Sequence, residues 1–425
     1  MKVAFYLDNK GIRDIDLSNI LYGNPGMGGT EYMLILVSYL LSIRNNHVDI
    51  IVYTTHDASN LPLEMHTKKV DNISDAINRA TGDGCEYFIF IHKEWYISDR
   101  ILDVSQDSIK LVPWVHIFMF KPDLDYYADN KAIYRVLHVG REQMDLYRDH
   151  RVFKKSLYIY NGINIRTNNE LSPINKRKNV VTYMGAIEPY KGLHLLTKAW
   201  KHVIKQVPDA ELYIIGSGKL YDSNTRLGEY GIAEKKYERE LIESLSADGT
   251  IPSNVHFVGK LGEEKYAILE QTKVAVPNPS GNTETFCITA LEMQLAGARI
   301  VTAKSPGTLE TVINGVLYTD VRELPQLIIK ELNSNVIHDD YISKIEELFS
   351  IDRVIEKWEM FLMNGLEEED KLSNPFYRLK FLKEFFRIVK AHIPCLDRQL
   401  PLIEKVILFS ERNLYKNKVQ YVYRG

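Results

Sequence analysis

Short apolar stretches alternate with helical patterns along this chain, and no other feature of the sequence constrains the fold as strongly. In the first part, a helix is expected at about residues 29–44, between the first two of six predicted strands. These strands are residues 2–7, 48–55, 87–92, 111–118, 135–140 and 156–163. Each is a nearly continuous apolar run, which is typical of a parallel sheet that is covered by helices on both faces.

The same alternation restarts after a polar stretch that ends at residue 179 and has no periodicity. A chain of 425 residues is too long for one ordinary core, so two domains are expected. The alternation predicts that both are doubly wound α/β domains, whose ligands bind beyond the carboxyl ends of the strands, in a cleft between the domains. In the second part, predicted strands 180–187, 211–217, 254–261, 273–279 and 299–303 alternate with helices 192–207, 234–247, 263–272 and 285–297.

The expected domain organisation follows from these segments. We expect an N-terminal α/β domain at residues 1–164, a linker at 165–179 and a C-terminal α/β domain at 180–350. A closing helix at 351–365 and an extension at 366–425 complete the prediction.

The extension has its own charge and periodicity. From Lys371 onward there are 12 Lys and Arg against 4 Asp and Glu, a net charge of +8, so the overall −3 leaves −11 for the rest. A helix is expected at about 374–395, with one apolar face and one basic face. The apolar face carries Leu379, Leu382, Phe386, Val389 and Ile393, and the basic face carries Lys380, Lys383, Arg387 and Lys390. Such a helix lies on an anionic membrane surface or packs on the acidic body of the protein.

Several classes of protein are excluded. The longest apolar runs stop near ten residues, so no membrane-spanning helix is expected. The first residues lack the apolar core of a signal peptide and are interpreted as a strand. The three cysteines, Cys85, Cys287 and Cys395, are too few and too widely spaced for a disulfide framework or a zinc site, which favours a reducing compartment such as the cytoplasm.

The stretch GNTETFCITALEMQLAGA, residues 281–298, carries two glutamates in an otherwise apolar segment. If a helix starts just after Glu284, the unpaired N–H groups of Phe286, Cys287 and Ile288 form an anion site suited to a phosphate. Glu292, two turns deeper, is then able to accept hydrogen bonds from a ribose diol. This arrangement suggests a nucleotide-sugar site. On spacing alone, Glu284 as a helix cap and Glu292 pointing to solvent is the simpler interpretation.

This stretch resembles the Glu-x7-Glu motif of the retaining glycosyltransferases of family 4, which have the GT-B fold. The matching residues are Glu284, Phe286, Leu291, Glu292, Met293, Ala296 and Gly297, whereas Cys287 stands where the family usually has glycine. The resemblance implies that Glu284 lies near the transferred sugar, that Glu292 binds the ribose, and that residues 180–350 form the nucleotide-sugar-binding domain. Residues 1–164 would form the acceptor-side domain.

Other stretches resemble further elements of that family, over about residues 1–365. Gly28 and Gly29 match a Gly-Gly loop whose backbone approaches the donor diphosphate or sugar. Lys191 matches the lysine that holds the diphosphate, but Ala186 replaces the usual arginine. The backbone of Gly259, Lys260 and Leu261 is expected to face the nucleobase.

Two further candidates lie in the N-terminal half. His116 ends a predicted strand where the family often has a histidine near the acceptor, and His92 is a weaker candidate. Asp123 and Asp125 form an Asp-x-Asp triplet, which in GT-A glycosyltransferases holds a divalent metal. Here we interpret that triplet as part of a loop or a helix start.

The resemblance implies a retaining glycosyltransferase that moves a sugar from a UDP- or GDP-linked donor to a hydroxyl of a glycan or glycolipid acceptor, without a required metal or cofactor. It suggests surface-polysaccharide or glycolipid biosynthesis in the cytoplasm or at the inner face of the cytoplasmic membrane, with no nucleic-acid partner. A catalytically weak GT-B subunit that binds a partner glycosyltransferase and a GT-B sugar-nucleotide epimerase remain alternatives, the first because of Ala186 and Cys287.

Overall fold

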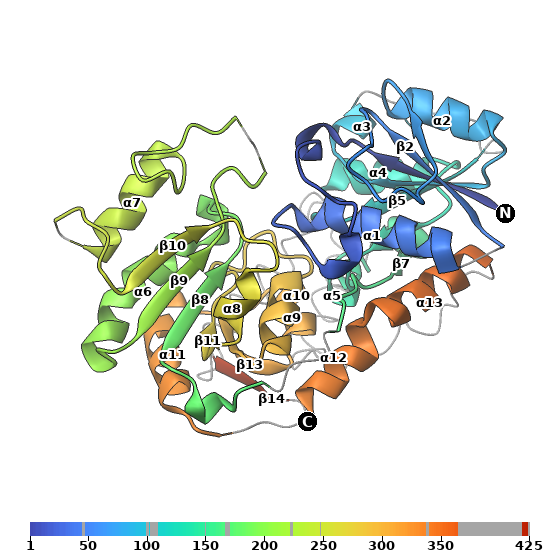
Figure 1. Ribbon diagram of the computed structural model, residues 1–425. Helices are drawn as coiled ribbons and strands as arrows, with labels where there is room; N and C mark the ends of the chain where they lie inside the picture. The colour runs from blue at the N-terminus through green and yellow to red at the C-terminus, as the bar shows by residue number, and fades with distance from the viewer. Residues whose placement is uncertain are drawn as a thin grey trace. The chain divides into compact units, whose positions relative to one another are not determined.

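The structure is a computed structural model, and it describes residues 1–44, 47–98, 102, 109–148, 150–165, 171–221, 224–246, 248–336, 340–363 and 419–423. The chain forms two compact units, which are drawn in Figure 1. The first contains residues 1–22, 29–162 and the helix Ile351–Met363. The second contains residues 23–28, 163–350 and the strand Val419–Tyr423.

A seven-stranded parallel sheet forms the centre of the first unit. Its strands are β1 (Lys2–Leu7), β2 (Asp49–Thr54), β3 (Thr67–Lys69), β4 (Tyr87–Ile91), β5 (Lys110–Val115), β6 (Val136–His138) and β7 (Ser156–Tyr158). They are ordered β3-β2-β1-β4-β5-β6-β7, so the order reverses between β1 and β4. In β1, β2 and β5 every residue after the first is buried, which explains why these strands read as continuous apolar runs.

Helices cover both faces of this sheet because side chains alternate along each strand. Phe88 packs on one face in a cluster with residues of α2 and α4. On the other face, the ring of Trp358 lies 4.8 Å from Trp114 and 6.0 Å from Phe5. Trp358 belongs to α13, which runs beside α1 (Figure 1) although some 300 residues of sequence separate them. The helices of this unit are α1 (Gly29–Arg44), α2 (Ile73–Gly82), α3 (Trp95–Ser98), α4 (Lys121–Asp129), α5 (Arg141–Asp145) and α13 (Ile351–Met363).

The second unit repeats this topology. Its strands are β8 (Val180–Met184), β9 (Glu211–Ile215), β10 (Val255–Gly259), β11 (Val274–Ala275), β12 (Arg299–Ala303), β13 (Asn314–Tyr318) and β14 (Val419–Tyr423). The order is β10-β9-β8-β11-β12-β13-β14, with a reversal between β8 and β11. The first six strands are parallel, and β14 pairs antiparallel with β13 at the edge.

The helices of the second unit also lie on both faces of its sheet. One core cluster joins Trp200, Leu241 and Ile328, from α6, α7 and α11, to the strands. A second cluster on the opposite face includes Ala290 and Met293 of α9. The helices are α6 (Leu193–Gln206), α7 (Lys235–Leu245), α8 (Lys265–Leu269), α9 (Ile288–Leu295), α10 (Pro306–Thr311), α11 (Leu324–Asn333) and α12 (Tyr341–Phe349).

The predicted fold class, two doubly wound α/β sheets, is confirmed, with local differences. The three-residue strand β3 and the edge-ward strand β13 were not predicted. β11 covers only Val274 and Ala275, because the following Pro277 and Pro279 have no N–H to donate to a ladder. The boundary between the two units falls between residues 162 and 163. Residues 23–28 belong to the second unit, and α13 belongs to the first.

The C-terminal extension differs from its prediction wherever it is described. The expected basic amphipathic helix at 374–395 lies outside the described residues. Within 366–425, only β14 is described, and it is a strand and not a helix. Its sequence VQYVY consists mostly of β-branched and aromatic residues, which favour a strand. Among the described residues, no helix combines the length and apolar content that crossing a bilayer requires.

Candidate active site

Two loops leave the carboxyl ends of β8 and β11, the neighbouring strands between which the order of the second sheet reverses. The loop after β8 carries Lys191, and the loop after β11 carries Asn278 and Glu284. Doubly wound sheets bind ligands at such a reversal, because the two loops diverge there and leave a crevice. Topology therefore brings together residues that are far apart in sequence.

Lys191 and Glu284 form an ion pair at this position. The Lys191 Nζ atom lies 3.0 Å from Oε2 of Glu284, with 15% and 11% of the two side chains exposed. The same carboxylate oxygen accepts a hydrogen bond of 2.8 Å from Nδ2 of Asn278, which is buried. A carboxylate held by an ammonium and an amide has a fixed direction, so the polar groups of this cluster are ordered.

The charge of Lys191 is secure. Burial by itself lowers the pKa of this ammonium, but the negative charge of Glu284 and its hydrogen bond outweigh burial and leave the pKa raised. Lys191 therefore stays protonated throughout the physiological pH range.

Gly192 allows the two loops to approach. Its φ of +79° lies in the left-handed region, and a Cβ there would be 2.7 Å from Cβ and 2.8 Å from the backbone nitrogen of Ser280. Any other residue would separate the loop of Lys191 from the loop of Glu284.

The helix after Glu284 begins later than predicted. α9 starts at Ile288 with Cys287 as its N-cap, so Glu284 lies before the helix and does not cap it. The Ile288 N–H donates to the Phe286 carbonyl at 3.1 Å, so this N–H group is already paired within the turn. Phe286 packs its buried ring 5.6 Å from Phe349. The predicted start of the helix is therefore wrong: α9 begins three residues later, after Phe286 has packed into the core.

Cys287 is a buried thiol at this turn. Burial and then the negative charge of Glu284 raise its pKa to about 12. It is therefore neutral at physiological pH and packs at this turn as a small apolar side chain.

Glu292 is also buried, and its partner is Lys265 of α8. The Lys265 Nζ atom lies 2.7 Å from Oε1 of Glu292, with only 4% and 9% of the two side chains exposed. The simpler interpretation, that Glu292 points to solvent, is wrong. Lys265 also donates to the backbone carbonyl of Asn24 at 3.3 Å, within the same unit.

Residues 23–28 form a compact loop around Asn24. The Asn24 Oδ1 atom accepts from the N–H groups of Gly26 and Met27 at 2.9 and 2.8 Å. Of the two predicted glycines, Gly28 falls in this loop and in the second unit, and Gly29 begins α1 in the first.

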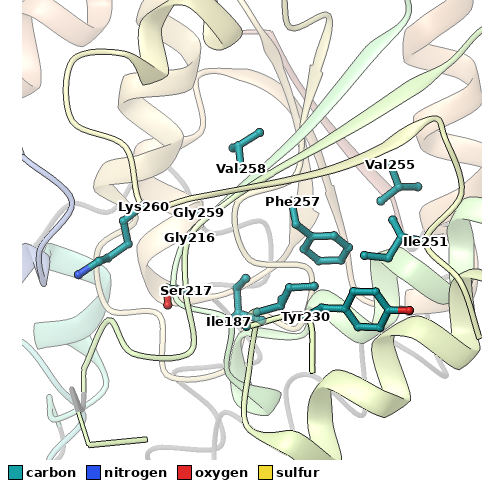
Figure 2. Close-up of a pocket in the computed structure, with 12 residues that line it drawn as sticks. Ile187, Gly216, Ser217, Tyr230, Ile251, Val255, Phe257, Val258, Gly259 and Lys260 are labelled. Atoms are coloured by element: carbon teal, nitrogen blue, oxygen red, sulfur yellow. The ribbon is translucent and has the colours of Figure 1, made fainter. Parts of the chain in front are cut away.

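A pocket of about 470 Å³ opens along β10, the first strand in the order of the second sheet (Figure 2). Gly259 and Lys260 line one end together with Gly216 and Ser217. Gly259 has a φ of +76° and open space where a Cβ would project, so the backbone is bare at this point. Leu261 does not line the pocket and packs on the cluster around α9.

The two histidines lie in the first unit, at the ends of neighbouring strands. His116 directly follows β5, and burial lowers its pKa to about 3. His92 follows β4 and hydrogen-bonds the Tyr127 hydroxyl through Nδ1 at 2.6 Å, and burial lowers its pKa to about 4. Both imidazoles are neutral at physiological pH, which leaves them hydrogen bonding rather than cationic roles.

The Asp-x-Asp triplet has a structural explanation. Asp123 lies in the first turn of α4 and accepts from the N–H of Phe120 at 2.9 Å. Asp125 pairs with Lys121 at 3.1 Å and with His150 at 3.1 Å. The described part of the chain contains no group of three His, Cys, Asp or Glu residues that is able to hold a metal ion.

Two residues of this cluster of ion pairs and hydrogen bonds, Asn278 and Lys265, were not predicted from the sequence. Asn278 lies at a strand end beside the reversal of strand order, a position that could have marked it. Lys265 gave no signal, because lysines on short helices usually face solvent.

Comparison with known proteins agrees with this geometry. The family model described as "Glycosyl transferases group 1" matches residues 164–347. An "Uncharacterized glycosyltransferase" of Haemophilus influenzae is 24% identical over 215 residues, which cover 48% of this chain and 55% of that protein. The "Lipopolysaccharide 1,2-N-acetylglucosaminetransferase" of Salmonella typhimurium is 30% identical over 141 residues, 32% of this chain and 33% of that protein. The chain thus spans about half or less of the curated relatives it matches.

A solved structure extends the likeness in fold. The apo form of the lipopolysaccharide outer core galactosyltransferase WaaB is 14% identical, with a TM-score of 0.55 over 86% of this chain and 100% of that one. Two doubly wound units with this likeness define the GT-B fold. The second unit therefore matches the glycosyl transferases group 1 family over residues 164–347.

Proposed function

We propose that this chain is a retaining glycosyltransferase that transfers a sugar from a UDP- or GDP-linked donor to a hydroxyl of a glycan or glycolipid acceptor. The observation that carries the proposal is the pair of buried cation–carboxylate contacts, Lys191–Glu284 and Lys265–Glu292, in the part of the chain that matches the family. Two carboxylates held in fixed directions suit hydroxyl-rich ligands, because charged acceptors bind hydroxyl donors strongly.

In this proposal, several residues of the chain bind different parts of the donor. Lys191 stabilises the negative charge on the departing diphosphate, helped by the backbone of Gly28 and Gly29 and the N–H groups of the turn at Phe286 and Cys287. Glu292, oriented by Lys265, accepts hydrogen bonds from the ribose. The backbone around Gly259–Leu261 faces the nucleobase, next to the pocket along β10.

In the proposed reaction, Glu284 positions the sugar while its bond to the diphosphate breaks. A new bond forms between the anomeric carbon and the acceptor oxygen on the same face of the sugar. The proton of the acceptor hydroxyl passes to the departing phosphate oxygen, so the protein need not supply a base. Lys191 then needs only to remain charged, which agrees with its raised pKa.

His116 is proposed as a hydrogen-bonding residue of the acceptor-side unit. With a pKa of about 3 it remains neutral at working pH, so it orients a hydroxyl rather than taking up a proton for long. Replacement by Asn is therefore expected to retain more turnover than replacement by Phe.

The acceptor class is drawn from relatives. The Salmonella relative is named for a lipopolysaccharide acceptor, and WaaB for the lipopolysaccharide outer core. A lipid-linked glycan in surface-polysaccharide assembly, handled at the cytoplasmic membrane face, is the corresponding proposal here. It also gives the basic segment 374–395 an anionic surface to bind. A protein that ends near Gly365 should then bind anionic liposomes less well than the full chain, and equal binding would remove this part of the proposal.

One observation favours a second candidate, a GT-B subunit with weak activity that supports a partner enzyme. Ala186 stands where the family has an arginine, and it is buried with its carbonyl accepting from the Tyr183 hydroxyl at 2.7 Å. That position therefore supplies no cation to the diphosphate. Substitution of Ala186 by Arg should raise turnover if the missing cation limits an active enzyme.

The decisive experiment is product analysis with UDP- and GDP-sugars, a glycan acceptor mixture, and EDTA. Transfer that persists in EDTA and keeps the donor's anomeric configuration supports the proposal. Activity that requires a restored divalent metal contradicts it. Epimerised donor without transfer identifies the epimerase alternative, and absence of both leaves the supporting subunit.

A further inference from the structure

Residues 227–234, which we call the 227–234 loop, form a turn in the last part of the connection from β9 to α7. Gly228 donates its N–H to the carbonyl of Ala233 at 2.9 Å, and Leu227 and Glu234 form an antiparallel bridge. Gly231 has a φ of +70° at the turn. Ile232 and Ala233 are buried in the core cluster of the second unit, so one side of the loop is anchored.

A buried carboxylate braces this loop. Glu238 of α7 is only 3% exposed, and its Oε1 accepts from the Tyr230 N–H at 2.9 Å. Its Oε2 accepts from the N–H groups of Ile232 at 2.7 Å and Ala233 at 3.3 Å. A Cβ on Gly228 would overlap the same carboxylate. Three amide donors compensate the burial of this charge, so Glu238 fixes the backbone of residues 230–233.

The braced loop forms one wall of the pocket along β10. Tyr230, Gly231 and Ile232 line that wall, and Phe257 of β10 faces it with Ile251. Figure 2 shows the side chains of Tyr230, Phe257 and Ile251 turned toward one another, while Ser217 and Lys260 lie at the other end. Tyr230 keeps 47% of its surface exposed, so its ring is accessible to a ligand. One end of the pocket is therefore lined by uncovered backbone, and the other end is lined by two aromatic rings.

We propose that the 227–234 loop selects the nucleobase of the donor, with Tyr230 and Phe257 as specificity-determining residues and Glu238 as a positioning residue. The inference rests on the proposed function, which brings a base to Gly259 and Lys260. A planar heteroaromatic ring stacks favourably on aromatic side chains, and the gap between the loop and β10 sets whether one ring or two fused rings fit. Because Glu238 holds the loop, it sets this gap without touching the base.

The test measures dissociation constants of UDP, CDP, GDP and ADP by calorimetry, for the wild-type chain and for Tyr230→Ala and Glu238→Gln. We expect the wild type to favour pyrimidine or purine at least tenfold. Tyr230→Ala should weaken the favoured nucleotide about tenfold, the loss of one base–aromatic stack, and bring the pyrimidine-to-purine ratio toward one. Glu238→Gln should shift this ratio in the same direction.

Matched controls separate this role from general structure. Tyr213→Ala removes a ring that stacks 4.5 Å from His256, and neither of these two residues lines the pocket. Glu240→Gln changes an exposed carboxylate on the same helix, paired with Lys198. Both control variants should keep the pyrimidine-to-purine ratio within twofold of the wild-type value. If Glu238→Gln does not fold, the Tyr230→Ala variant still tests the proposal, because Tyr230 is exposed.

Two results would overturn the inference while leaving the proposed function intact. One is a wild type that binds all four nucleotides equally, and the other is a base ratio unchanged in both Tyr230→Ala and Glu238→Gln. A wild type that binds none of the four nucleotides would overturn the proposed function itself, and the inference with it.

Discussion

The ammonium of Lys265 lies 2.7 Å from the carboxylate of Glu292, and both side chains are almost completely removed from water. The pair joins α8 to α9, and Lys265 also reaches the carbonyl of Asn24 at 3.3 Å. A buried ion pair usually adds little net stability, because desolvation offsets its attraction. Under the proposed function, the pair instead fixes the direction of a carboxylate that binds the ribose.

This explanation predicts opposite effects on stability and binding. Lys265→Met leaves a buried carboxylate unpaired and should cost about 3–5 kcal/mol of unfolding free energy. Combining it with Glu292→Leu removes both charges and should recover most of that loss, but nucleotide binding should remain weak. Urea unfolding and calorimetry on the two variants give the comparison. A double variant that binds nucleotide as the wild type does would show that the pair is only structural.

The two glutamates should affect kinetics differently. Glu292→Ala is expected to raise the dissociation constant of the nucleotide with less effect on kcat. Glu284→Ala should chiefly lower kcat, by about 100-fold, as expected when a transition-state contact is lost. Steady-state kinetics with varied donor separate the two effects, and unchanged kinetics in both variants would refute the assignment of the donor site.

Gly192 offers a test of the approach between the two loops. Gly192→Ala should disturb the Lys191–Glu284 pair, because the new Cβ meets Ser280 at 2.7 Å. Gly249→Ala is the matched control, since Gly249 has a similar φ of +76° with nothing within 4 Å of its Cβ. Both lose about 1 kcal/mol through backbone strain. Only Gly192→Ala should also weaken nucleotide binding, and equal binding by the two variants would argue against a donor site at these loops.

Buried histidines predict acid sensitivity of the first unit. Burial lowers the pKa of His138 to about 3, with a further effect of His92, so folding favours the neutral form. The stabilisation is present above the ordinary pKa of about 6.5 and is lost as pH falls toward 3. Between pH 7 and pH 5 one such histidine should cost about 2 kcal/mol.

Urea unfolding of the first unit at the two pH values checks this prediction. His138→Gln should make the loss between pH 7 and pH 5 smaller by about 2 kcal/mol. His66→Asn, at an exposed position in the same unit, is the matched control. If His138→Gln loses as much unfolding free energy between pH 7 and pH 5 as the wild type does, the prediction is contradicted.

Much of the fold could be predicted because its strands are buried on both faces. A strand such as β1, with every residue after Lys2 buried, must be apolar throughout, and this is visible in sequence. β13 and β14 were missed for opposite reasons. β13 lies beyond the last clear alternation, whereas β14 comes from the distant C-terminus and pairs with the edge that β13 offers.

The site was harder to predict than the fold. Lys191 and Glu284 could be named from sequence, but not that they touch, because their contact depends on which strands are neighbours. The helix start at Ile288 was misjudged because burial of Phe286 against Phe349 outweighs local helix preference. Lys265 and Glu238 were invisible, since nothing in the sequence distinguishes a lysine or glutamate that is buried by tertiary packing from one that is solvated.

The most direct test of the account is a thermal-shift panel with UDP, GDP, ADP and CDP, with and without EDTA, on the wild type and on Glu292→Ala. A ligand at about 100 times its dissociation constant stabilises the folded protein by roughly 2.7 kcal/mol, which raises the melting temperature measurably. We predict a shift by one diphosphate that is indifferent to EDTA and absent in Glu292→Ala. No shift with any nucleotide, or an equal shift in the variant, would contradict a donor site built on Glu292.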